Sequence, residues 1–145
     1  MNISNIEERL SNLNETQTPL WGMMTPQHMV EHLSSLFAIS LGKVRIEPFY
    51  DNDAQVVKKE AFYSKRQFPK NVQIKGSENK LFPLRFENLG VAKEKLLNSI
   101  TQFNSAGIQN PDAIIPHPVF GPLTFTEWEI FHDIHINHHF SQFEI

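Results

Sequence analysis

The chain has 145 residues, a net charge of −3 at neutral pH and no cysteine. Its length predicts one domain over residues 1–145, because chains usually divide only beyond roughly 250 residues. The lack of cysteine excludes disulfides, thiolate metal ligands and an internal cysteine nucleophile. No basic cluster suits a phosphate backbone, so nucleic acid is not an expected partner. Without a signal-peptide pattern or an apolar run of about 20 residues, the chain is expected to be cytoplasmic, with no membrane contact.

Helical spacing dominates the first part of the chain. Apolar residues three and four apart predict a short helix over residues 3–13. Thr25 and Pro26 indicate a second helix start, because threonine caps helices and proline suits the first helical position. This helix should continue to about Leu41, since Gly42 offers a stop.

The middle of the chain has a weaker pattern. Residues 42–53 favour a connection, and a short helix with a weak apolar side follows it. That side consists of Val56, Val57, Ala61 and Phe62. Turn-forming residues then predict a long irregular crossover over 70–85. A third long helix is expected over 88–106, where apolar residues repeat at helical spacing before Gly107.

Several prolines precede the last helix and indicate a loop without a convincing run of strands. They are Pro111, Pro116, Pro118 and Pro122. Thr124 and Glu127 match a capping box, so the last helix should begin there and extend nearly to the C-terminus. The predicted fold is therefore all-α, a four-helix bundle with one long crossover connection and room for an extra short helix.

Four of the seven histidines lie within residues 131–139. His135 and His139 are four residues apart, so on an ideal helix their directions differ by only about 40° and their rings can approach one centre. Taken singly, each histidine fits a surface or core role. A buried set is costly unless each ring finds partners, because an unmatched polar group costs about 1–3 kcal/mol. A shared divalent metal would remove that cost, so we interpret the pair as metal ligands.

A functional divalent site usually takes at least three protein ligands. His28 and His32 on the second helix are also four residues apart. We choose His32 because it lies deeper in the apolar stretch, while His28 can line the pocket or face solvent. His132 and His138 are interpreted as groups behind the ligands or at the surface, and Trp21, Trp128, Phe120 and Phe131 as core anchors.

His117 lies in a proline-rich stretch just before the last helix. The simpler interpretation is a structural turn. The alternative is a loop histidine near the metal, acting as a donor or general base, which makes His117 the candidate catalytic residue. Glu31 and Asp133 neighbour ligands in sequence, but a one-residue offset turns a helical side chain about 100° away. We therefore interpret both as surface groups or as groups behind the ligands.

Three segments together resemble the DinB-like superfamily of metal-binding four-helix proteins, nearest its DUF1569-type members. Residues 21–33 resemble that family's Trp-x-x-x-Thr entry and early-helix histidine. Residues 117–124, followed by Glu127 and Trp128, form the second segment, and residues 135–142 resemble its His-x-x-His-His-x-x-Gln ending. The resemblance implies that His32, His135 and His139 are the three metal ligands, and it is weak over residues 42–85.

Three imidazoles leave a coordination position open, as in catalytic sites, where zinc can lower the pKa of bound water to about 7. The resemblance implies a metal-dependent hydrolase or a thiol-cosubstrate transferase acting on a small molecule. Any thiol must be an external low-molecular-weight compound, because the chain has no cysteine. The alternative is a non-catalytic metal-binding or stress-related bundle. Zinc or nickel are the favoured ions, and the resemblance allows a homodimer.

Overall fold

The computed structural model describes residues 1–70 and 80–145, which contain five helices and one pair of strands. The elements are α1 (Ile3–Ser11), α2 (Pro26–Ser40), α3 (Asn52–Lys65), α4 (Leu89–Gln109), β1 (Ile114–His117), β2 (Gly121–Thr124) and α5 (Phe125–Gln142). Most of the crossover predicted for 70–85, residues 71–79, lies outside the described residues. The mainly helical prediction is confirmed.

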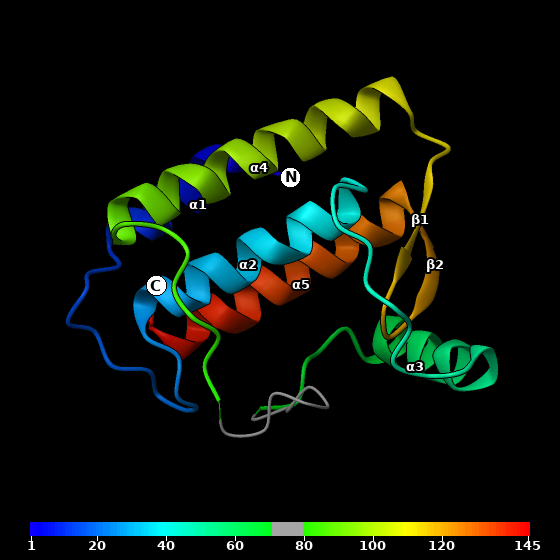
Figure 1. Cartoon of the computed structure of the whole chain (residues 1–145), viewed down its shortest axis with the longest axis horizontal. Coiled ribbons are helices and arrows are strands. Elements are labelled where there is room, and N and C mark those ends of the chain that lie inside the picture. Colours follow the sequence, from blue (N-terminus) through cyan, green and yellow to red (C-terminus); the bar gives the residue numbers. More distant parts are fainter. Residues whose placement is uncertain (71–79) are drawn as a thin grey trace.

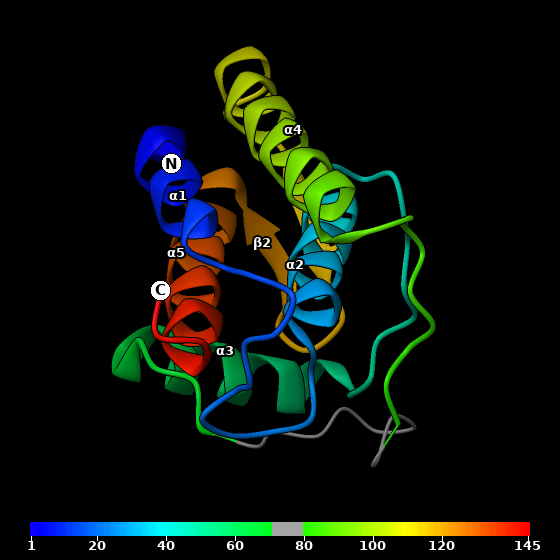
Figure 2. The same ribbon diagram turned by 90° about the vertical axis from the view of Figure 1, so that its left-hand side faces the viewer.

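Four of the helices lie alongside one another (Figure 1). Seen from the end of the molecule, α1 and α5 are on one side and α4 and α2 on the other, while α3 lies below α2 and α5 (Figure 2). The strand pair stands at one end, where β2 leads directly into α5. A continuous apolar core includes residues from all five helices. No helix in the described part of the chain combines the length and apolar character needed to cross a bilayer.

The predicted start of α2 is confirmed. The Thr25 side chain accepts a hydrogen bond from the His28 backbone N–H, and Pro26 occupies the first turn, where its missing N–H costs nothing. Beyond Ser40, Gly42 has a φ of +68°, a left-handed conformation that glycine adopts without steric cost. The α2 side chains that face α4 and α5 are consequently held in a helix with defined ends.

The predicted capping box of α5 is also confirmed. The Thr124 side chain accepts from the Glu127 backbone N–H, and the Glu127 carboxylate accepts from the Thr124 backbone N–H at 2.8 Å. These two bonds satisfy donors that would otherwise be free at the helix start. They fix where α5 begins and therefore which of its histidines face the core.

The prediction of a strand-free loop before α5 is wrong, because β1 and β2 form an antiparallel hairpin. Ile114 pairs with Thr124, and Pro116 faces Pro122 in the same register. Gly121, with a φ of +71°, opens the second strand in a conformation that favours glycine. Proline has no backbone N–H to donate to a neighbouring strand, so the prolines obscured the strand pattern in the sequence. Short edge strands nevertheless tolerate proline.

The predicted stop at Gly107 is wrong by one turn of helix, since α4 continues to Gln109. Gly107 is buried inside the helix, and a Cβ there would overlap three atoms of the Phe125 ring. Glycine is present because α5 approaches α4 closely at this point, not because α4 ends there. The Phe125 ring in turn stacks on Phe103 at 4.5 Å between centroids.

The short helix α3 forms as predicted, but of its predicted apolar side only Phe62 is buried. Val56 and Val57 are 55% and 64% exposed, whereas Gln55 and Phe62 are buried. Phe62 contacts the ring of Phe120, with 4.9 Å between centroids. Packing against the hairpin and α5 therefore selects which face of α3 is buried, overriding a weak local pattern.

A candidate metal centre

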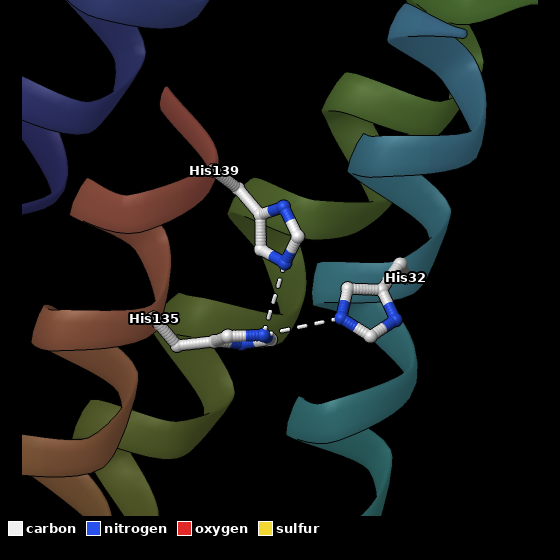
Figure 3. A group of neighbouring side chains, drawn as sticks. All are labelled: His32, His135 and His139. Atoms are coloured by element: carbon white, nitrogen blue, oxygen red, sulfur yellow. Dashed lines mark hydrogen bonds between the residues drawn. The ribbon is translucent and has the colours of Figure 1, made fainter. Parts of the chain in front are cut away.

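Three histidines from two helices converge at one point. His32 comes from the middle of α2, and His135 and His139 come from successive turns of α5, with their rings directed toward one another (Figure 3). The Nε2 atom of His135 lies 3.1 Å from the Nε2 atoms of both His32 and His139. One ligand atom from each ring can be chosen so that all three lie within 4.8 Å of one another. The structure thus brings together the three residues that the sequence singles out, in a group that can form a metal site.

The nitrogen spacing fits a divalent ion. With metal–nitrogen bonds of about 2.0–2.1 Å, tetrahedral ligands lie about 3.3 Å apart, close to the two observed separations. Hydrogen bonding is a poorer account, because each ring nitrogen is either one donor or one acceptor. The Nε2 atom of His135 lies beside the Nε2 atoms of both His32 and His139. As a single donor or a single acceptor, it cannot form a full hydrogen bond with both. The donor set therefore suits a metal better than it suits a hydrogen-bonded group.

The electrostatics of the cluster favour neutral imidazoles. Burial, with contributions from His139 and His138, lowers the pKa of His32 to about 3. Burial likewise places the pKa of His135 well below its ordinary value. It lowers that of His139 to about 4, although a hydrogen bond to Gln142 opposes the shift. Neutral rings offer lone pairs at pH 7, which metal coordination requires.

The carboxylates nearest the ligands in sequence are directed elsewhere. Glu31 is not a surface group: it is only 5% exposed and accepts from the backbone N–H groups of Arg85 and Phe86 at 2.8 and 3.1 Å. Burial raises its pKa, but these bonds and others from Gln27 and the Arg85 side chain give a net lowering. Asp133 is exposed, as one of the two predicted alternatives stated. Glu31 consequently anchors residues 85–86 on α2.

The remaining histidines of α2 and α5 occupy three different settings. His28 is half-buried, with Nδ1 2.7 Å from the Thr25 hydroxyl, and does not join the cluster. His132 is not at the surface, since it is 1% exposed, stacked on Phe37 and 2.8 Å from the Ser40 hydroxyl. His138 is half-buried and lies beside His139, with 5.2 Å between ring centroids.

His117 has a clear structural role in the hairpin. Its Nδ1 accepts from the backbone N–H groups of Val119 and Phe120 at 3.1 and 3.3 Å. This assigns the ring proton to Nε2, a buried atom that finds no hydrogen-bond partner in the described part of the chain. The only ring lone pair is thus already used, and burial lowers the pKa of His117 to about 3, which argues against a general base. Its ring contacts Phe131, which in turn contacts His135, so His117 lies one aromatic layer behind the cluster.

Two aromatic residues near the cluster differ from the sequence interpretation. Trp21 is half-buried, with 5.7 Å between the centroids of its ring and the His138 ring, so it is not a core anchor. Phe68 was not singled out, yet its ring contacts both His135 and His138 at 5.1 and 5.6 Å. A lone aromatic before a proline carries no periodic signal that could have revealed it. The other proposed anchors, Trp128, Phe120 and Phe131, are buried as expected.

Fold and site together define a mainly helical protein with a largely buried three-histidine cluster. Residues 57–145 match the family described as a protein of unknown function, DUF1569. The chain belongs to the DUF1569 family. The matched region contains His135 and His139 but not His32, so the third member of the cluster is supported by geometry. Comparisons with curated proteins and with solved structures found no match.

Proposed function

We propose that this protein binds one divalent metal ion through His32, His135 and His139 and uses it in catalysis on a small molecule. The proposed reaction is hydrolysis or the transfer of a low-molecular-weight thiol. In this proposal α1, α2, α4 and α5 form a four-helix bundle of the DinB-like superfamily. The observation that carries the proposal is the meeting of three Nε2 atoms in one group, two of whose histidines are buried.

The composition of the cluster supports a catalytic site over a closed structural one. Structural zinc sites usually have four protein ligands, whereas catalytic sites keep three and leave a position open. Among residues 1–70 and 80–145 the cluster contains three histidines and no carboxylate. His135 and His139 are buried and His32 is half-buried, so His32 is the member of the group nearest to solvent. A small molecule could therefore approach from the side of α2.

In this proposal the residues around the cluster have distinct roles. His32, His135 and His139 hold the ion through neutral imidazole nitrogens. When bound, a divalent ion supplies Lewis acidity, which polarises a substrate oxygen and lowers the pKa of an attacking water or thiol. Phe68 and Phe131 cover the His135 ring and exclude water from that side. With Nδ1 occupied, His117 is left only a donor role through Nε2.

The metal assignment is tested on untagged protein by elemental analysis and chelator competition. We expect about one zinc or nickel ion per chain in the wild type. His32→Ala, His135→Ala and His139→Ala should each lose it while circular dichroism shows the helices intact. His28→Ala is the matched control, because His28 is one turn from His32 on the same helix but outside the cluster. Full metal retention in all three ligand variants would refute the site.

The catalytic part needs a separate test. Metal-loaded wild type and His139→Ala are compared on small esters, amides and lactones, with and without added thiol. Turnover that requires the metal supports the catalytic proposal. If turnover also requires added thiol, the enzyme is a thiol transferase and not a hydrolase. A crystal structure with the native metal that showed a fourth protein ligand and no opening to solvent would overturn the enzyme in favour of a non-catalytic metal-binding protein.

A further inference from the structure

Gln142, the last residue of α5, joins the histidine cluster to a distant part of the chain. Its side chain is almost fully buried, with 4% exposed. The Oε1 atom lies 3.0 Å from Nδ1 of His139, and the Nε2 atom donates to the Trp21 carbonyl at 2.6 Å. Both ends of one amide are therefore occupied, one by a cluster histidine and the other by the segment before α2.

These two bonds determine the tautomer of the neutral His139 ring. The Trp21 carbonyl can only accept, so it must face the NH2 end of the Gln142 amide. The Oε1 end then faces His139 and can only accept, which places the ring proton on Nδ1. The Nε2 lone pair of His139 is left pointing into the cluster, as a metal ligand requires. Such a bond behind a ligand fixes both its tautomer and its ring orientation.

The segment around Trp21 is attached to the same residue at a second point. The Leu20 backbone N–H donates to the Gln142 carbonyl at 2.8 Å. Gly22 has a φ of +79°, and a Cβ there would lie 3.0 Å from Gln142 Nε2. The Trp21 ring, held in this way, lies beside His138 and 4.3 Å from the Lys70 ammonium. The order of this segment thus depends on the amide that orients His139.

We propose that Gln142 is a positioning residue of the metal centre, which holds His139 ready to bind the ion and couples ion binding to the Trp21 segment. The proposal rests on the proposed metal site. It assigns two separable tasks to one side chain, since Oε1 acts on His139 and Nε2 acts on Trp21. Substitutions that keep only one end of the amide can therefore separate them.

Two variants make this separation. Gln142→Leu removes both bonds and should weaken metal binding about 10–100-fold. Gln142→Glu keeps an acceptor for His139 but, while ionised, has no donor for Trp21, so its metal affinity should stay at or above that of the wild type. Ser141→Ala, a neighbouring exposed position on α5, is the control and should bind metal normally. Affinities are measured by zinc competition with a chromogenic chelator.

The coupling is measured through Trp21 fluorescence. Zinc should change the emission of the wild type, and Trp21→Phe should abolish that change, which separates it from Trp128. The change should also disappear in both Gln142 variants, although Gln142→Glu still binds zinc. A Gln142→Leu variant that bound zinc as tightly as the wild type, or a full Trp21 response in Gln142→Glu, would overturn the proposal.

A metal-free readout distinguishes failure of this proposal from failure of the metal site. Nitrogen-15 NMR of the histidine rings reports the tautomer of His139 without any ion. The wild type should carry the proton on Nδ1, and Gln142→Leu should give a mixture. The predicted tautomer with no zinc binding would refute the metal site alone, while the opposite tautomer in the wild type would refute the role of Gln142.

Discussion

Acid should destabilise the metal-free protein because its buried histidines must stay neutral to fold. Burial lowers the pKa of His117 to about 3 and that of His132 well below its ordinary value. In the unfolded chain both titrate near 6.5. Below that pH the unfolded chain therefore binds more protons than the folded one, so the free energy of unfolding falls as the pH falls.

The size of the effect follows from the number of such histidines. Between pH 7 and pH 5, one histidine that stays neutral in the fold costs about 2 kcal/mol of stability. Burial also lowers the pKa of each cluster histidine. Five histidines with a lowered pKa therefore contribute: His32, His117, His132, His135 and His139. Together they would remove about 9 kcal/mol, comparable with the whole stability of a small domain, about 5–15 kcal/mol. We expect cooperative acid unfolding near pH 5.

Urea unfolding with a chelator present, repeated from pH 7 to pH 5, measures this loss. His132→Gln should lose about 2 kcal/mol less than the wild type across that interval. Ser40→Ala is the control, because it removes the hydrogen-bond partner of His132 but leaves the ring buried. It should lower stability by a similar amount at every pH. If His132→Gln had the same pH dependence as the wild type, the argument from neutral burial would be refuted.

Two further predictions concern packing and a buried carboxylate. Gly107→Ala should destabilise the protein by about 1–2 kcal/mol in thermal unfolding, because overlap with the Phe125 ring outweighs a helix-propensity gain of about 1 kcal/mol; a stabilised variant would contradict the close approach. The backbone N–H groups of Arg85 and Phe86 bond to different oxygens of Glu31, so Glu31→Gln places its amide NH2 against one of these two donors, and hydrogen exchange at that amide should accelerate. Unchanged exchange there would show that the carboxylate does not anchor the segment.

The helices that carry the histidines could be predicted because their start signals are local. Thr25 with Pro26, and Thr124 with Glu127, satisfy backbone donors within a few residues of themselves. Distant parts of the chain need not be known for such bonds to form. The spacing of His135 and His139 is equally local, since one turn of α5 brings their rings to the same side.

The hairpin could not be predicted in the same way, because its support comes from outside its own strands. Proline suppresses the usual strand pattern, and Pro116 faces Pro122 across the pair. The turn is closed by the His117 ring, which accepts two backbone N–H groups. That ring is itself enclosed by aromatic side chains from the hairpin and α5, including Phe120 and Trp128. A histidine side chain in place of a turn residue carries no recognisable local signal.

The third cluster histidine shows where periodicity stops being sufficient. His28 and His32 are one turn apart on α2, so helical spacing alone places both toward α5. Only the packing of α2 against α5 distinguishes them: it brings His32 within 3.1 Å of His135, while the Thr25 hydroxyl at the helix start occupies the Nδ1 atom of His28. His32 and His135 are 103 positions apart in the chain. The cluster therefore depends on two features: the four-residue spacing of the histidines within α5, and the packing of α2 against α5, which determines which α2 histidine reaches them.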